Sequence, residues 1–326
     1  MTKTEDSTPV PPRQSKGLAP RPTPGAYFPR RYLIEFFEFL KTHEADIEVL
    51  TYADFPWGDD WDFAGSYPAE RKSWLAQLAS GERDPRKVYV LLQYDVDSWP
   101  ERTMALLRDQ SHRALPANVM VFNKRVERKR LLEKGEVHIT DYDLDDEFLQ
   151  SLNSEGFVVG YHTNAFEQAL FDTRRALDIF DQDVRALSQR FPIAFFSAHG
   201  GAPSPDGRNN RDLPFHENWR AKLRWVHNGC SPIFDGQFSD GGHLSLNRNP
   251  QQRDLRDFVR RLKRGKRYRI LLHPQYYSER PAVSARYRDT NWYDGVTDAS
   301  PDMPLWKDVR LSRWPRFNFA SYFFGR

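Results

Sequence analysis

The chain contains a single cysteine, Cys230, among its 326 residues. One thiol cannot form an intrachain disulfide, so the sequence is compatible with a reducing compartment. Residues 1–24 lack the apolar core of a signal peptide, and no apolar run reaches the roughly 20 residues that span a bilayer. We therefore expect a soluble, cytoplasmic protein without a membrane span.

Neither sign of charge is in large excess. The 48 basic and 45 acidic residues give a net charge of +3, so nucleic acid is not the expected partner. Two catalytic signatures are also missing. The chain has no Gly-x-Ser-x-Gly nucleophile elbow, and its Gly-Gly pairs at 200–201 and 241–242 lack the spacing of dinucleotide-binding or phosphate-binding loops.

Composition divides the chain into three parts. Hydrophobic residues make up 39% of the sequence, enough for a sizeable core. Residues 1–26 are rich in Pro, Thr, Ser and basic side chains and are expected to form a disordered tail. Residues 27–280 are expected to form the main domain, with its core at 87–277. The aromatic-rich extension over residues 281–326 is expected to pack on the outside of this domain.

Predicted strands and helices alternate through the main domain. Helical spacing of apolar residues appears at 30–42 and 69–78, with a short strand at 47–50 between them. From residue 87 onward the alternation is regular and implies a parallel sheet, open or closed. Strands are expected at 87–93, 117–122, 157–161 and 194–198 and around 225, 238 and 268, with helices from Pro100 and over 145–154, 165–190, 216–223 and 255–263.

Four of these strands lead into residues that can bind a metal or move a proton. The first leads to Asp95 and Asp97, and the other three lead to His162, His199 and His273. In a β/α barrel the C-terminal ends of the strands converge on one mouth, so these side chains should meet there. Imidazole and carboxylate groups are common zinc ligands. On an extended strand the two carboxylates point the same way, which suits one metal ligand and one general base.

Each of these residues also has a structural explanation. Asp97 could cap the helix that begins at Pro100, His162 could be a hydrogen-bonded structural histidine, and His199 could be incidental to a glycine-rich turn. None of these explanations accounts for the fact that four strands each lead into a residue of this kind. The joint pattern therefore favours a functional site.

The pattern resembles the polysaccharide deacetylases, which are the NodB-homology carbohydrate esterases, and among them a divergent Asp-x-Asp subgroup. The resemblance rests on Asp95-Val96-Asp97, Gly160-Tyr161-His162-Thr163 and Leu271-Leu272-His273, and it covers roughly residues 87–277. It implies an α/β fold with a distorted (β/α) barrel of seven strands as a single main domain, and an acylated carbohydrate as the substrate.

The resemblance also implies roles for individual residues. Asp95 matches the catalytic base, Asp97 and His162 match metal ligands, and His273 matches the general acid. Asp240 lies where the family often has an aspartate that orients the catalytic groups, so it is a further catalytic candidate.

Two positions depart from the family pattern. The second histidine of the family's second motif is replaced by Phe166, and the family's arginine beside prolines is replaced by the segment 197–201. We infer that His199, within that segment, supplies the missing third ligand from the neighbouring strand. Glu167 and Asn164 are the alternatives for this ligand.

Four residues are expected to contact substrate. At Gly200 and Gly201 the backbone can be approached closely. Trp292, like Trp306, lies in a turn-like region where an aromatic face could stack on a sugar. Tyr94, which precedes Asp95, completes this set.

We therefore predict a metal-dependent hydrolase that removes an acetyl or other acyl group from an N- or O-acylated sugar or polysaccharide precursor. The bond cleaved would be a non-peptide carbon–nitrogen bond or a carboxylic ester, and the cofactor a divalent metal ion, with Zn²⁺ as the first choice. Two alternatives stay open. One is a catalytically silent relative that binds a glycan or partner protein, motivated by Phe166, and the other is a hydrolase of a non-sugar carbon–nitrogen bond.

Overall fold

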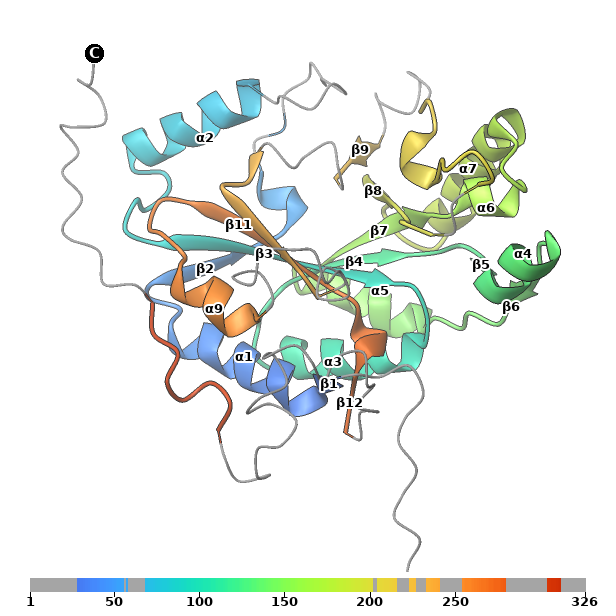
Figure 1. The fold of residues 1–326 in the computed structure, drawn as a ribbon. Coiled ribbons are helices and arrows are strands. Elements are labelled where there is room, and N and C mark those ends of the chain that lie inside the picture. The colour runs from blue at the N-terminus through green and yellow to red at the C-terminus, as the bar shows by residue number, and fades with distance from the viewer. Residues whose placement is uncertain are drawn as a thin grey trace, which may run out of the picture.

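The computed structural model describes residues 28–55, 57, 68–201, 204–215, 223–226, 233–240, 254–279 and 304–311. These residues form a curved sheet with helices on its outer side (Figure 1). The tail over residues 1–26, the helix expected over residues 216–223 and the expected substrate contact Trp292 lie outside the described residues, apart from residue 223.

A curled sheet of parallel strands forms the centre of the fold. Its strands are β2 (Ile47–Leu50), β3 (Val88–Val96), β4 (Asn118–Val121), β7 (Val158–Thr163), β8 (Phe195–Ala198), β9 (Arg224–Trp225), β10 (Gly236–Ser239) and β11 (Arg267–Leu272). The order is β10-β11-β3-β4-β7-β8-β9. Strand β3 pairs with β11 on one edge. On its other edge, the first half of β3 pairs with β2 and the second half pairs with β4. The predicted α/β fold with a distorted barrel of seven parallel strands is confirmed, with seven strands in this order and β2 as an eighth strand beside them. Within the described residues β9 and β10 do not pair, so the barrel is open there.

The central strand β3 is buried on both faces. Val90 and Leu92 pack in the large cluster shared with the outer helices, whereas Tyr89 and Leu91 face an inner cluster. Side chains alternate between the faces of a strand, so Asp95 falls on the inner face with Leu91. Each fully buried apolar side chain contributes about 1.5–3 kcal/mol to folding, which makes the register of β3 costly to change.

Helices and short segments complete the fold. Helices α1, α3 and α5 lie on one side of the sheet (Figure 1). No helix of the described residues is long and apolar enough to cross a membrane. The helices are α1 (Arg30–Thr42), α2 (Pro68–Ser80), α3 (Pro100–Ser111), α4 (Arg128–Lys134), α5 (Asp146–Ser154), α6 (Ala165–Gln168), α7 (Thr173–Ser188) and α9 (Leu255–Arg260), and the short strand pairs are β1 (Phe28–Pro29) with β12 (Tyr277–Ser278) and β5 (Arg125–Val126) with β6 (Ile139–Thr140).

The prediction of one long helix over residues 165–190 is wrong. The structure has the short α6 and then α7, separated by Leu170 (φ 53°) and Phe171 (φ 66°) in the left-handed region. Asp172 then caps α7 by accepting a hydrogen bond from the backbone of Arg175. The break places α6, with Glu167, directly after β7 at the end of the sheet.

The described part of the C-terminal extension packs on α1. The ring of Trp306 lies 4.9 Å from that of Phe36, and its Nε1 donates to the carbonyl of Tyr32 at 2.8 Å. Trp306 is only 5% exposed. It is a core residue in this structure, so the expectation that it offers a face to sugars is wrong.

Candidate metal centre

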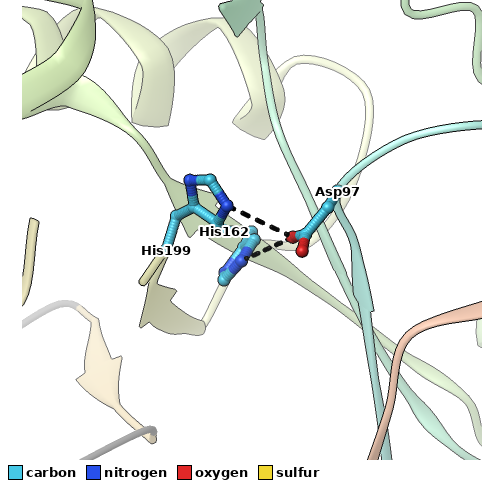
Figure 2. Close-up of side chains that lie close together, drawn as sticks. All are labelled: Asp97, His162 and His199. Atoms are coloured by element: carbon cyan, nitrogen blue, oxygen red, sulfur yellow. Dashed lines mark ion pairs between the residues drawn. The ribbon is translucent and has the colours of Figure 1, made fainter. Parts of the chain in front are cut away.

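Three side chains from three strands meet at the C-terminal ends of the sheet. Asp97 follows β3, His162 lies in β7 and His199 follows β8. Figure 2 shows both imidazoles beside one carboxylate oxygen: the distance to Asp97 Oδ1 is 3.1 Å from His162 Nε2 and 3.8 Å from His199 Nε2. One ligand atom of each residue lies within 4.8 Å of the other two, a spacing that suits one bound cation.

The second ring nitrogen of each histidine has a partner that orients the ring. His199 Nδ1 lies 3.1 Å from Glu167 Oε2, and His162 Nδ1 lies 2.7 Å from Ser197 Oγ. Because a carboxylate only accepts, the proton of a neutral His199 sits on Nδ1 and the lone pair of Nε2 faces Asp97. Carboxylate partners of this kind commonly orient metal-binding imidazoles and raise their basicity.

The two oxygens of Asp97 differ in their surroundings. Oδ2 accepts a hydrogen bond from Gln275 Nε2 at 3.3 Å, whereas Oδ1 is buried and faces the Nε2 atoms of His162 and His199. A buried carboxylate oxygen is unfavourable unless donors or positive charge compensate it. One carboxylate and two imidazoles form a common ligand set for a catalytic divalent ion. The residues present therefore fit the expected metal.

Phe122, directly after β4, closes one side of this centre. Its ring stacks on His162 at 5.1 Å and meets His199 edge-on at 5.2 Å. The ring is 2% exposed. An apolar wall lowers the local dielectric constant and strengthens the charge interactions of the two imidazoles.

The charges at the centre are coupled. Burial by itself would raise the pKa of Asp97, but the neighbouring His199, His162 and His273 hold it well below its usual range. Burial would likewise lower the pKa of His199, but the carboxylates of Asp97 and Glu167 raise it to about 8. A cation that binds here must therefore displace a proton from His199 at neutral pH.

Metal affinity is expected to fall on acidification for this reason. The pKa of His199 is raised to about 8, so the protonated form that competes with the metal gains population below that pH. Between pH 8 and pH 6 the loss of affinity from this group alone should be on the order of 50-fold. Competition with a chromophoric chelator at fixed ionic strength measures it. Equal affinity at the two pH values would contradict His199 as a ligand.

Asp95 lies beside the same centre on the inner face of β3. Its Oδ2 is 3.7 Å from His162 Nε2, and its Oδ1 accepts from Gln93 Nε2 at 2.7 Å. Gln93 Oε1 accepts in turn from the hydroxyl of Tyr52, which lies in the short helix η1 (Tyr52–Asp54). The Tyr52 donor fixes the orientation of the amide, so Gln93 presents an N–H group to Asp95.

His273 lies on the other side of Asp97. Its Nε2 is 3.8 Å from Asp97 Oδ2, its Nδ1 is 2.5 Å from Asp240 Oδ1, and its backbone N–H donates to Asp240 Oδ2 at 2.7 Å. Burial lowers the pKa of His273, but fully buried Asp240, with Asp97 and Asp95 adding to its effect, raises it to about 10. His273 is therefore protonated at neutral pH.

The structure thus brings together Asp95, Asp97, His162, His199 and His273, with Asp240 behind His273. Glu167 and Asn164, the two alternatives for the third ligand, make other contacts. Glu167 orients His199. The side chain of Asn164 donates to the carbonyl of Lys124 and accepts from Gln168, and Phe166 is buried against Phe171.

Several residues at this centre were not predicted in their observed positions. Gln93 could have been found, because it precedes Asp95 by two residues and shares its strand face. Glu167 was considered as a ligand rather than as the partner of His199. Ser197, Phe122 and Gln275 carry no signal in the sequence, because only the folded chain brings them to the centre.

The expected substrate contacts have different outcomes. Tyr94 is fully buried in the cluster on the outer side of β3, opposite Asp95, so its prediction as a substrate contact is wrong. A Cβ on Gly201 would clash with the carboxylate of Glu167, so this glycine lets Glu167 reach His199. A Cβ on Gly200 would meet no atom within 4 Å, which leaves its backbone open to a ligand.

Glu167→Ala is expected to weaken metal binding about 10- to 100-fold, because His199 loses the partner that orients it. Glu167→Gln should recover part of the affinity, since its amide oxygen can still accept from Nδ1. Isothermal titration with the divalent metal measures both variants. Unchanged affinity in Glu167→Ala would show that the Glu167–His199 contact does not support a ligand.

No profile of a known protein family and no curated protein matches the chain. Among solved structures, similarity is found to the peptidoglycan deacetylase PdaC from Bacillus subtilis, with 14% identity, 66% of this chain and 86% of that chain covered, and a TM-score of 0.33. A family 4 carbohydrate esterase from Bacillus anthracis has 14% identity, coverage of 66% and 74%, and a TM-score of 0.29. A CE4 esterase from Streptococcus mutans has 12% identity, coverage of 69% and 87%, and a TM-score of 0.33. The similarity is remote, and the activities of these proteins are not transferred to this chain by it.

Proposed function

We propose that this protein is a metal-dependent hydrolase that removes an acyl group from an acylated sugar. One observation carries the proposal: the ligand set of Asp97, His162 and His199 is flanked by an acidic side chain on one side and an imidazole on the other. Asp95 lies on the side of His162, and His273 lies on the other side of Asp97 with its pKa raised to about 10. An acid and an imidazole placed on either side of the reacting group are typical of acid–base catalysis.

A divalent ion held by Asp97, His162 and His199 would polarise the acyl oxygen and lower the pKa of water. One ligand atom of each residue already lies within 4.8 Å of the other two, so these residues need little rearrangement to bind the ion. Zn²⁺ is the ion we propose, since it favours a mixture of imidazole and carboxylate ligands.

Asp95 is placed to accept the proton of the attacking water. Its Oδ1 is engaged by Gln93, which leaves Oδ2 on the side of His162 and the ligand set. The donor is a neutral amide rather than a cation, so no counter-ion is paired with that oxygen. A general base needs a fixed orientation of this kind.

His273 is placed to give a proton to the departing nitrogen or oxygen. The carboxylate of Asp240 is hydrogen-bonded to both Nδ1 and the backbone N–H of His273. These two contacts fix the imidazole ring so that its Nε2 faces Asp97. With its pKa raised to about 10, the imidazole is charged before the reaction begins. An amine or alkoxide leaving group needs such a donor, because it departs poorly without a proton.

The test combines elemental analysis with a substrate panel. Protein purified without a metal-affinity tag should contain about one equivalent of a divalent metal and should release acetate from N- or O-acetylated sugars. Removal of the metal with a chelator should abolish release, and its return should restore it. Release from small non-sugar amides alone would support the carbon–nitrogen hydrolase alternative. Metal-free protein that binds a glycan without turnover would overturn the proposal in favour of a silent binding protein.

A further inference from the structure

Asp183 is a buried acidic residue outside the metal centre. It lies in α7 and is 2% exposed. Its Oδ1 accepts a hydrogen bond from Asn123 Nδ2 at 2.6 Å, and its Oδ2 accepts from the Tyr161 hydroxyl at 2.8 Å and from Gln168 Nε2 at 2.9 Å. All three donors are neutral groups. A carboxylate accepts at both of its ends, whereas the amide of asparagine has one acceptor oxygen, so the three contacts together require an acid here.

Two of these donors are next in sequence to residues of the metal centre. Tyr161 precedes the ligand His162 in β7, and Asn123 follows Phe122, whose ring stacks on His162. Side chains alternate along a strand, so Tyr161 points to the outer side of the sheet while His162 points to the inner side. Asp183 therefore holds the backbone of both segments from the side of the sheet opposite to the metal centre.

The third donor connects Asp183 to the short helix α6, which packs against α7 beside the end of β7 (Figure 1). Gln168 Nε2 also donates to Asn164 Oδ1 at 2.8 Å, so one amide group joins both ends of α6 to α7. A helix of four residues is not stable by itself and needs tertiary contacts. Glu167, the neighbour of Gln168 in α6, contacts Nδ1 of His199. The hydrogen bond to Asp183 therefore helps to fix the position of Glu167.

The backbone directly after α6 is strained. Leu170 and Phe171 both have positive φ values, which are unfavourable for bulky L-residues. Strain of this kind persists only where the surrounding structure imposes it, and it gathers at functional sites. The hydrogen bond from Gln168 to Asp183 joins the segments on the two sides of this strained turn, and it is one of the contacts that hold the turn in place.

We propose that Asp183 is a positioning residue of the metal centre. Through Gln168 it holds α6 so that Glu167 stays directed at the ligand His199. Removal of the Asp183 carboxylate releases α6 and weakens metal binding, although Asp183 itself contacts none of the three ligands. The inference rests on the proposed function for the metal site, but not for the reaction.

The test compares Zn²⁺ affinity in two matched variants, measured by competition with a chromophoric chelator well below both melting temperatures. Asp183→Ala is expected to weaken Zn²⁺ binding about 10-fold, because a metal ligand loses the support of its orienting partner. Asp254→Ala is the control, since Asp254 is also buried and also accepts from a tyrosine hydroxyl, that of Tyr32 at 2.6 Å. The control should lower the melting temperature and leave the affinity unchanged. An equal loss of affinity in both variants would overturn the proposal.

A double-mutant cycle tests whether Asp183 acts through Glu167. In the Glu167→Ala background, Asp183→Ala should weaken Zn²⁺ binding by less than about 3-fold, because the contact that it supports is already lost. A general structural role predicts the same loss in both backgrounds. A loss of about 10-fold in each would therefore overturn the proposed route through α6.

Two milder variants keep the test valid if Asp183→Ala does not fold. Asp183→Asn should retain part of the affinity, since its amide oxygen can still accept from Gln168. Gln168→Met keeps the length of the side chain but removes the amide that bonds to Asp183, and it should weaken Zn²⁺ binding about 3- to 10-fold. Wild-type affinity in Gln168→Met would show that α6 is held without this contact and would overturn the proposal.

The outcomes also separate the positioning role from the reaction. Excess Zn²⁺ should restore acetate release from acetylated sugars to Asp183→Ala, because its ligands and acid–base groups are intact. Weakened Zn²⁺ binding in Asp183→Ala, in a protein that releases no acetate even as wild type, would sustain the positioning role and overturn the proposed reaction. Acetate release with wild-type Zn²⁺ affinity in Asp183→Ala would overturn the positioning role alone. Wild-type protein that binds no Zn²⁺ would overturn both.

Discussion

Asp97→Ala is expected to leave the purified protein without its divalent metal and to reduce acyl hydrolysis by at least about 10³-fold. Asp97 Oδ1 lies between the Nε2 atoms of His162 and His199 and is the carboxylate oxygen of the ligand set. Removing it leaves two imidazoles, too few to hold the ion in the geometry of a catalytic site. Elemental analysis and acetate release from acetylated sugars measure the two effects.

The matched control is Asp257→Ala. Asp257 is a half-buried acid on α9 that pairs with Arg260, so its loss should change neither metal content nor activity. Circular dichroism should show both variants folded. Full metal occupancy in Asp97→Ala would place the ion elsewhere. Loss of the metal with activity retained would show that hydrolysis does not depend on it.

Asp240→Asn is expected to lower kcat by about 10²- to 10⁴-fold while the metal stays bound. The carboxylate of Asp240 is the main reason that the pKa of His273 is raised to about 10. An amide of the same shape has one acceptor oxygen, so it can accept from Nδ1 or from the backbone N–H of His273 but not from both, and it removes the charge. The pKa of His273 then falls, because burial lowers it and the largest opposing charge is gone. A smaller fraction of the imidazole carries the proton that it must donate. Activity as a function of pH, with metal content measured in parallel, tests this.

The sign of the pH effect follows from the direction of the shift. A pKa raised from 6.5 to about 10 in the folded protein adds stability that is complete below pH 6.5 and lost as the pH rises through 10. The difference in stability between wild type and Asp240→Asn should therefore shrink over this range. Asp254→Asn is the control, because Asp254 is also buried but caps α9 away from the centre, where asparagine caps equally well. Equal kcat in wild type and Asp240→Asn would remove His273 as the acid.

Much of the fold could be predicted from local patterns. The apolar run of β3, Pro100 at the start of α3 and the acidic caps of α5 and α7 each act within a few residues, so they are visible in the chain. The break within the helix expected over residues 165–190 was missed because the apolar spacing continues across Leu170 and Phe171. Their left-handed backbone depends on packing of the short α6 rather than on local preference.

The candidate site divides in the same way. Asp95, Asp97, His162, His199 and His273 could be named because each follows or ends an apolar strand, and parallel strands bring such ends together. The error at Tyr94 was one of register, since alternation places it on the face opposite Asp95. The aromatic signal was assigned to Trp292, which lies outside the described residues, and to Trp306, which proved to be core, whereas the exposed Trp99 was not considered.

The sequence by itself determined the parallel α/β architecture and the residue types at the strand ends, because hydrophobic period and strand termination are properties of neighbouring residues. Only the tertiary structure decided what each of those residues faces. Glu167, from α6, contacts His199, and Asp240, from the neighbouring strand, contacts His273. Gln275 contacts both Asp97 and Arg102, and Arg102 lies against Trp99. Such pairings depend on side-chain direction in the packed fold, and no local pattern in the chain specifies them.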